Sequence, residues 1–447
     1  MRSIYITTLL AILLSVNAKA DTTGFVNVNV VPMTSETVIY AQTVIVTDGI
    51  ITTIGDVDNT PLPKDAVVVD GTDRFLIPGL AEMHGHVPDG SSQSLERVLS
   101  LYVVNGITTV RGMLGQRSHL QLKDDIKSRA VLGPRLITSG PSLNGRSVSS
   151  TAAATGMVEA QHAAGYDFLK IHPGLTREEF DAMAETANRL GIKFAGHVPE
   201  DVGVDRALAA GIATIDHLDG YMETLLSPND SPSGGVSGLF GVFIADQADE
   251  AKIDEIVAAT AAAGVWNVPT ESLFEHAVSP TLDPSVMADW PEMKYMPKST
   301  VDQWENGKRE LFDDANYKAS TALRAIELRH RLIVALQEAG AGLLLGSDAP
   351  QIFNVPGFSI HRELEFLVDA GLTPYQALRT GTVNAARYFA VEDHLGTVQT
   401  GMSADLVLLD ANPLEDISNS RRIHGVVVNG RWLSRQEIER ILEKFER

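Results

Sequence analysis

Short apolar stretches alternate with helical stretches through the middle of this 447-residue chain, and this alternation limits the folds open to it. Eight stretches between about residues 76 and 388 read as strands: residues 80–86, 106–111, 135–139, 167–171, 193–197, 213–217, 265–269 and 342–348. Helical patterns lie between most of them, at residues 176–190, 204–210, 249–263 and 321–339. Alternating βα units indicate a parallel α/β architecture, and eight units in about 300 residues fit a (β/α)₈ TIM barrel. A doubly wound open sheet is the alternative, but no glycine-rich phosphate loop follows any of these strands.

Both ends of the chain read as β-structure. Residues 24–75 hold alternating apolar segments around the turn dipeptide Asp48-Gly49, and residues 404–410 and 425–430 are strand-like. Neither flank is complete as a separate domain. We therefore predict that residues 24–75 and 389–434 pair into one small β-sandwich domain, with the barrel of residues 76–388 inserted between them. Residues 272–319 interrupt the unit after the seventh strand and are a candidate lid.

Composition and charge exclude several classes of function. Apolar residues make up 44% of the chain and charged residues 21%, which is typical of a soluble globular protein. Acidic residues outnumber basic ones 57 to 36, and such a surface repels nucleic acid and anionic lipid. The chain has no cysteine, so it has neither disulfides nor a thiol that could carry a lipid anchor. We expect no nucleic-acid partner and no membrane anchor.

Residues 1–20 have the features of a secretory signal peptide. Arg2 supplies the positive start, residues 6–16 the apolar middle, and Ala18-Lys19-Ala20 a cleavage site before Asp21. The apolar part is shorter than the roughly 20 residues that span a bilayer. We expect a periplasmic or secreted protein; a buried N-terminal helix is the alternative reading.

Two histidines at the end of the first predicted strand begin the candidate site. A strand over residues 80–86 points His84 and His86 to the same side, where two imidazoles can bind one divalent metal ion. An HxH pair alone is common by chance. Further metal-competent or anionisable side chains lie at the ends of the fourth, fifth, sixth and eighth predicted strands: Lys170, His197, His217 and Asp348. In a TIM barrel such strand ends meet at one rim, where active sites form.

These strand ends resemble the amidohydrolase superfamily, specifically its branch with two metal ions and a carbamylated lysine. The resemblance covers about residues 25–434 and is closest to the prolidase-like and imidazolonepropionase-related members. The motifs that carry it are Pro78-Gly79-Leu80 with His84-Gly85-His86, Gly165 to Lys170, Gly196-His197-Val198-Pro199, Asp216-His217-Leu218, Gly346-Ser347-Asp348, and Gly401 to Val407 with Asn429-Gly430. One departure is Arg111-Gly112, where related sequences often have Arg-Asp.

The resemblance implies a binuclear site with two divalent metal ions, for which Zn²⁺ is expected. His84, His86 and Asp348 would hold one ion, and His197 and His217 the other. Lys170 would bridge the two as a CO₂-derived carbamate. Asp348 would act as general base and then general acid for a metal-bridging hydroxide that attacks an amide carbonyl. Other readings are a surface lysine for Lys170 and a helix N-cap for Asp348.

Several other residues are weaker candidates. Tyr221, Asn144 and Arg146 are candidates for substrate binding, although a packing tyrosine and a turn are equally compatible with the sequence. His172 has the strand parity for the barrel interior, but the resemblance gives it no ligand role. His361 and Glu363 are candidates for supporting the metal ligands.

We therefore expect a metal-dependent amidohydrolase that cleaves an amide bond in a small peptide such as an Xaa-Pro dipeptide, an N-acyl amino acid or a cyclic amide. Its partner would be a small-molecule or short-peptide substrate, and we expect a homo-oligomer. A lactonase or phosphotriesterase that uses the same metal site is the alternative enzyme. A catalytically silent barrel scaffold is the alternative outside enzymes, and the complete ligand set argues against it.

Overall fold

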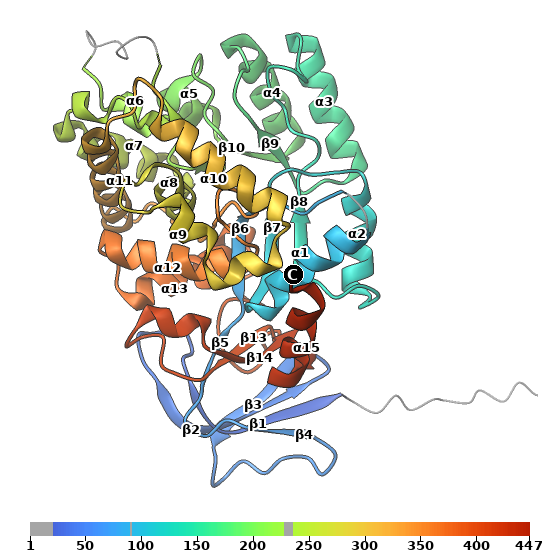
Figure 1. Ribbon diagram of the computed structural model, residues 1–447. Coiled ribbons are helices and arrows are strands. Elements are labelled where there is room, and N and C mark those ends of the chain that lie inside the picture. Colours follow the sequence, from blue (N-terminus) through green and yellow to red (C-terminus); the bar gives the residue numbers. More distant parts are fainter. Residues whose placement is uncertain (1–20, 90–91, 228–235) are drawn as a thin grey trace, which may run out of the picture.

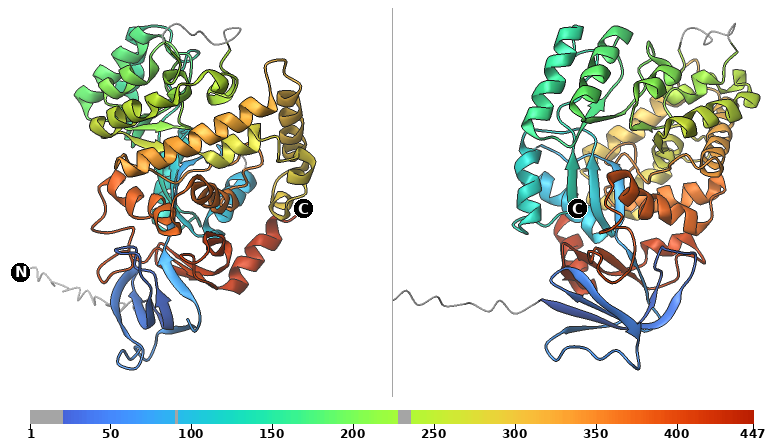
Figure 2. Two further views of the ribbon diagram at one scale, coloured as in Figure 1. Left: turned by 90° about the vertical axis from the view of Figure 1, so that its left-hand side faces the viewer. Right: turned by 180° about the vertical axis from the view of Figure 1, so that it is seen from behind.

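The computed structural model describes residues 21–89, 92–227 and 236–447 of a mixed α/β chain. A β-rich part lies at one end of the molecule, and a larger part in which helices surround strands forms the rest (Figure 1, Figure 2). The predicted signal peptide lies outside the described residues.

The β-rich part is one sheet built from both flanks of the chain. Its N-terminal strands are β1 (Thr22–Val30), β2 (Ile39–Thr47), β3 (Ile50–Asp56), β4 (Val67–Asp70) and β5 (Phe75–Pro78). Its C-terminal strands are β13 (Leu406–Leu409), β14 (Ile423–Val428) and β15 (Arg431–Leu433). The order is β15-β14-β13-β5-β1-β2-β3, with β4 paired to β1, so β13 and β5 join the two flanks.

A shared apolar core stabilises this sheet. Residues from both flanks pack in it, among them Val44, Leu76 and Leu408, all fully buried. The rings of Phe25 and Trp432 meet edge to face, with centroids 5.2 Å apart. Such alternating apolar side chains bury one face of a sheet, and here strands from both ends of the sequence contribute to that core.

The larger part contains two parallel sheets. One has the order β6-β7-β8 and the other β12-β11-β10-β9. Their strands are β6 (Leu80–Gly85), β7 (Ile107–Gly112), β8 (Arg135–Thr138), β9 (Phe168–Ile171), β10 (Lys193–Gly196), β11 (Thr214–Asp216) and β12 (Trp266–Val268). β6 follows β5 directly, so the strand that carries His84 continues out of the β-rich part.

Bridges and backbone hydrogen bonds span the gaps between these two sheets. A parallel bridge joins Ser139 to Phe168 on one side. On the other side, Leu343 forms a parallel bridge with Asn267, and Met83 N donates to Leu345 O. The predicted strand over residues 342–348 is therefore reduced to a single bridge position.

Helices cover the strands (Figure 1). They are α1 (Ser92–Val104), α2 (Ser118–Lys127), α3 (Thr151–Ala164), α4 (Arg177–Leu190), α5 (Gly203–Ala210), α6 (Tyr221–Thr224), α7 (Ile253–Ala263), α11 (Ala319–Glu338), α12 (Phe358–Ala370), α13 (Pro374–Thr380), α14 (Val383–Phe389) and the C-terminal α15 (Arg435–Phe445). α4 shows the local rules: Thr176 and Glu179 form a capping box, and Gly191 ends the helix in a left-handed conformation.

The excursion after β12 is helical. It contains α8 (Glu271–Val278), α9 (Pro284–Ala288), a 3₁₀ turn (Pro291–Tyr295) and α10 (Lys298–Phe312). Its apolar residues Met287, Met293 and Val301 share a cluster with Phe353, which lies in the loop after Asp348. The predicted lid thus packs on the loop that follows a candidate metal ligand.

None of the helices in the described residues is both long enough and apolar enough to cross a membrane.

Candidate metal centre

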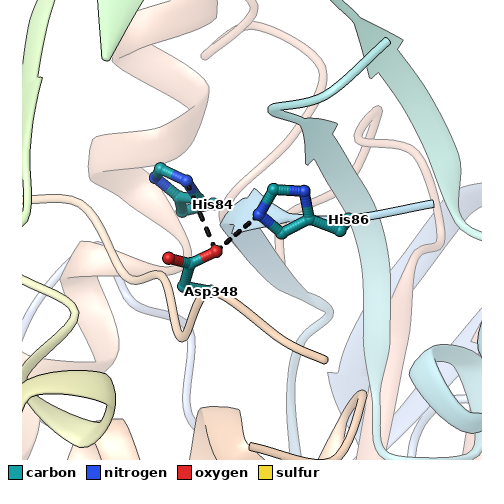
Figure 3. A group of neighbouring side chains, drawn as sticks. All are labelled: His84, His86 and Asp348. Atoms are coloured by element: carbon teal, nitrogen blue, oxygen red, sulfur yellow. Dashed lines mark hydrogen bonds and ion pairs between the residues drawn. The ribbon is translucent and has the colours of Figure 1, made fainter. Parts of the chain in front are cut away.

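His84, His86 and Asp348 meet at the ends of β6 and of the segment that follows Leu343. Asp348 Oδ1 lies 2.5 Å from His86 Nε2 and 3.6 Å from His84 Nε2 (Figure 3). One ligand atom from each residue falls within 4.8 Å of the other two. Two imidazole nitrogens and a carboxylate oxygen are a donor set that zinc-like ions accept.

Glu82 ties together the two segments that carry these ligands. One carboxylate oxygen accepts from the backbone N–H groups of His84 and Ser347, both at 2.9 Å, and the other accepts from the Ser347 hydroxyl. Burial raises the pKa of Glu82 to about 7. Asp348 N also donates to His84 O, so the backbone spacing between the ligands is fixed.

His197 and His217 follow β10 and β11 and face the same centre. The His217 ring lies 4.5 Å from the His84 ring and 4.7 Å from the His197 ring, between centroids. His217 Nε2 is 3.9 Å from Asp348 Oδ2. The second histidine pair therefore adjoins the first group through His217.

Lys170, on β9, lies in this region, and its buried Nζ has no hydrogen-bond partner among the described residues. Burial lowers its pKa to about 8, although Asp216 and Asp348 act in the opposite direction. Its charge in turn lowers the pKa of both His84 and His217. Gly196 leaves room for the side chain, since a Cβ there would lie 2.9 Å from Lys170 Cδ. A buried amine normally has a hydrogen-bond partner. A group bound at this site would supply the partner that Lys170 lacks here.

Carboxylates lie beside the Nδ1 atoms of two of the histidines. Asp216 Oδ2 is 2.9 Å from His84 Nδ1, and Asp219 Oδ2 is 2.9 Å from His197 Nδ1. Asp216 is itself held by the Arg111 guanidinium, at 3.1 and 3.2 Å. The contact at His197 is a hydrogen bond that leaves its Nε2 free to face a metal ion, whereas Asp216 pairs with His84 by charge, and His84 Nδ1 has no hydrogen-bond partner among the described residues. Arg111 thus finds its carboxylate partner in Asp216, without the Arg-Asp pair of related sequences.

Burial favours the neutral form of His84 and His217, which is the form that binds metal ions. Burial lowers the pKa of His84 and of His217 well below the usual value, with further contributions from nearby positive charge. Buried neutral imidazoles, a carboxylate and an unpartnered lysine fit a site for divalent ions.

The structure places Tyr221 away from this group. Its side chain is fully buried at the start of α6, and its hydroxyl contacts Thr260 Oγ1 and donates to Asn267 Oδ1, both at 2.9 Å. Its predicted role in substrate binding is not favoured by these contacts and stays a prediction.

Asn144 and Arg146 lie beside the centre, in a pocket of about 490 Å³ that His172 also lines. The Asn144 side-chain oxygen accepts from the backbone of Arg146 and Ser147, so this amide stabilises a turn. The Arg146 side chain is exposed. His172 stacks on His197 with centroids 5.2 Å apart, which joins the pocket to the histidines.

His361 and Glu363 behave differently from each other. His361 contacts Ser420 Oγ and Asn105 O and so ties α12 to the C-terminal region. Glu363 accepts from the N–H groups of Glu271 and Ser272, at the start of α8. It therefore fixes the segment next to Thr270, whose hydroxyl lies 2.8 Å from His217 Nδ1.

Other residues at the centre carry no signal in a single sequence. Phe240 stacks on His217 at 4.7 Å, with an interplanar angle of 11°. Gln351 donates to Asp348 Oδ1 at 2.8 Å. Asp219 contacts His197 and Thr270 contacts His217, and in both pairs the two residues are far apart in sequence. Only the fold brings them together.

Residues 75–433 match the model of the amidohydrolase family. The chain belongs to this family. The match covers both the segment that carries the histidines and the C-terminal strands of the β-rich part, so this amidohydrolase shares the family pattern over most of its length.

Proteins similar to this amidohydrolase include ochratoxinase, bottromycin amidohydrolase and an Xaa-Pro dipeptidase. Ochratoxinase from Aspergillus niger is 37% identical over 82 residues, which are 18% of this chain and only 16% of that protein. Bottromycin amidohydrolase superposes with a TM-score of 0.70 at 24% identity, over 95% of this chain and 89% of that one. An Xaa-Pro dipeptidase superposes with a TM-score of 0.65 at 19% identity, over 93% of this chain and 100% of that one. At such identities the structural likeness shows the fold.

Proposed function

We propose that this chain is a secreted, metal-dependent amidohydrolase that cleaves an amide bond in a small peptide, an N-acyl amino acid or a cyclic amide. The observation that carries the proposal is the meeting of His84, His86 and Asp348 beside His217 and the unpartnered amine of Lys170. The proposal takes the two parallel sheets as a closed (β/α)₈ barrel, on the strength of the bridges at Ser139 and Leu343.

The residues divide between two ions. His84, His86 and Asp348 would hold one, and His197 and His217 the other. Lys170 would reach both after carbamylation, because its buried amine is easily deprotonated and lacks any other partner in the part of the chain that the structure describes. When bound, divalent ions would lower the pKa of water toward neutrality and polarise the scissile carbonyl.

The chain's own residues would do the rest. Asp348 takes the proton of the attacking water and passes it to the leaving nitrogen, while Gln351 steadies the carboxylate through Oδ1. The pocket beside His172 would accept the half of the substrate that carries a free carboxylate, with the exposed Arg146 guanidinium as its cationic partner.

Metal analysis and a substrate panel test this proposal. Purified protein should contain about two zinc-like ions per chain, and metal-free protein would support the silent scaffold. The panel should include Xaa-Pro and other dipeptides, N-acyl amino acids, cyclic amides, lactones and phosphotriesters. Hydrolysis of lactones or phosphotriesters alone would replace the amide assignment with the alternative enzyme.

Asp348→Asn tests the proton transfer. We expect kcat to fall on the order of 10²–10⁴-fold with a much smaller change in KM, because a general base and acid acts mainly in the transition state. Asp181→Asn, on the surface of α4 and paired with Arg206, is the matched control and should leave both constants unchanged. Unchanged kinetics in Asp348→Asn would show that another group carries the proton.

Secretion is a separate part of the proposal. Cleavage after Ala20 should give a mature protein that begins at Asp21, and N-terminal sequencing of protein from the periplasm or medium would establish this. Full-length protein retained in the cytoplasm would rule it out.

A further inference from the structure

We propose that Arg329, on α11, is a positioning residue that sets the affinity of the metal subsite formed by His197 and His217. The inference rests on the proposed two-ion function, and concerns a residue that makes no contact with the other ligand group, His84, His86 and Asp348, among the described contacts.

The Arg329 side chain is only 1% exposed and its guanidinium engages three groups at once. Nη1 donates to His217 O at 2.6 Å, and Nη2 donates to Pro269 O at 2.8 Å. Nε faces the Glu271 carboxylate, at 2.9 and 3.2 Å. The planar fork of an arginine suits this task because its donors point in fixed, diverging directions.

Both carbonyl bonds act on backbone in a rare conformation. His217 has a φ of +66°, and Thr270, directly after Pro269, has a φ of +50°. Residues with a side chain seldom adopt such angles, and they persist where surrounding contacts impose them. His217 and Thr270 are also the two residues whose side chains meet, Nδ1 to Oγ1 at 2.8 Å. Arg329 therefore holds the backbone on both sides of the contact that orients the His217 imidazole.

The ion pair with Glu271 is a separable part of this arrangement. Glu363 independently fixes the start of α8, since it accepts from the N–H groups of Glu271 and Ser272. The ring of Phe274 packs against the guanidinium, and the Arg329 Cζ atom lies 4.2 Å from the centroid of that ring. Loss of the ion pair should cost stability, whereas loss of the two carbonyl bonds should free the His217 ring.

Arg329→Lys tests the inference through metal binding. Lysine keeps the charge but has no planar fork, so it cannot span both carbonyls and the carboxylate. Metal-free protein is titrated with Zn²⁺ against a chromophoric chelator, with circular dichroism as the check on folding. Wild type should bind two ions. In Arg329→Lys the first affinity should stay within about twofold and the second should fall about tenfold or more, in line with the effect of losing an orienting contact.

Three further variants sharpen the test. Arg362→Lys is the matched control, because Arg362 also pairs with a carboxylate, Glu292, and stacks on Trp290. It should leave both affinities unchanged. Glu271→Gln keeps the carbonyl donors, so it should lower the melting temperature and leave the second affinity within about twofold. The double variant Arg329→Met with Glu271→Met leaves no unpaired buried charge, and it should reproduce the selective loss if the lysine variant does not fold.

Glu271, Glu275 and His330 form another group whose ligand atoms lie within 4.8 Å of one another. The second ion could instead bind to this group, and His330→Ala tests that alternative. If the second ion binds at His197 and His217, His330→Ala should still bind two ions. Loss of the second ion in this variant would show that this ion binds away from His217, and it would overturn the inference. Equal affinities in wild type and a folded Arg329 variant would also overturn it, as would a loss in Glu271→Gln equal to that in Arg329→Lys. Fewer than two ions in wild type would instead refute the proposed two-ion function on which the inference stands.

Discussion

At the scale of single residues, the candidate centre depends on carboxylates that lie beside the Nδ1 atoms of two histidines. Asp216 faces His84 Nδ1 and Asp219 faces His197 Nδ1. The hydrogen bond to Asp219 selects the His197 tautomer that leaves Nε2 as the metal donor, and the negative charge of either carboxylate makes its imidazole a stronger ligand. Asp216 is itself held in place by the guanidinium of Arg111.

Asp216→Asn should weaken metal binding by about 10–100-fold, because the amide cannot supply the negative charge that supports His84. Competition for Zn²⁺ with a chelator of known affinity measures this change. Asp181→Asn serves as the control, since its partner Arg206 lies on the surface. An affinity equal to that of wild type would mean that the backbone alone positions His84.

The candidate ligands could be named from the sequence, and the residues that support them could not. Strand parity places His84 and His86 on one side because neighbouring side chains on a strand alternate. The contact between Asp216 and His84 joins strands far apart in the chain, so it depends on how the fold brings β6 and β11 together. Phe240 has no motif that would mark it as a neighbour of His217.

At the scale of elements, the excursion of α8 to α10 is anchored by an unusual buried lysine. Lys308, on α10, is 2% exposed, and its Nζ donates to His276 O at 2.7 Å. Burial lowers the pKa of Lys308 to about 7, against the smaller opposing influence of Asp283 and Glu275. The folded chain therefore releases this proton at a lower pH than the unfolded chain does.

Lys308→Met should change the pH dependence of stability. Because the folded pKa is about 7 and the usual value is 10.5, the unfolded state binds the extra proton between these values, and stability rises with pH across this window. The wild-type free energy of unfolding should gain up to about 1.4 kcal/mol per pH unit relative to Lys308→Met. Urea denaturation between pH 7 and pH 10 measures the difference.

Lys298→Met supplies the control for this element. Lys298 lies on the same helix, pairs with Asp302 and is 77% exposed in its side chain. Its removal should leave the pH dependence as in wild type. Parallel curves for wild type and Lys308→Met would show that the buried amine keeps its proton.

Most elements followed from the sequence, and the exceptions have physical causes. The stretch at residues 342–348 has the apolar pattern of a strand, but its backbone bonds are divided among Asn267, Met83 and Thr380, so no continuous ladder forms. α15 lies beyond the predicted β-structure. Its start was nevertheless visible, because Ser434 and Glu437 have the spacing of a capping box and form one in the structure.

At the scale of the whole molecule, one sheet draws together both ends of the chain. β13 pairs with β5, and β5 runs directly into β6, which carries His84. Gly79, between β5 and β6, donates its N–H to Asp405 O. The C-terminal strands therefore support the strand that carries His84, a candidate metal ligand.

Leu408→Ala should destabilise the molecule as a unit. Leu408 on β13 is fully buried in the core shared by both flanks, and loss of such a side chain costs about 2–5 kcal/mol. Urea denaturation should show an earlier midpoint and one transition by both fluorescence and circular dichroism. Val68→Ala, on a β4 side chain that is 64% exposed, should change stability by less than about 0.5 kcal/mol. Two separate transitions would show that the sheet unfolds independently of the metal-bearing part.

The pairing of β5 with β13 also bears on how the protein is made. During synthesis β5 emerges early, and its partner appears only after almost all of the remaining chain has been translated. Until then β5 presents an open edge, which is a template for misassociation. A product that ends before Leu406 would keep that edge open, because β13 is the strand that covers it in the folded protein.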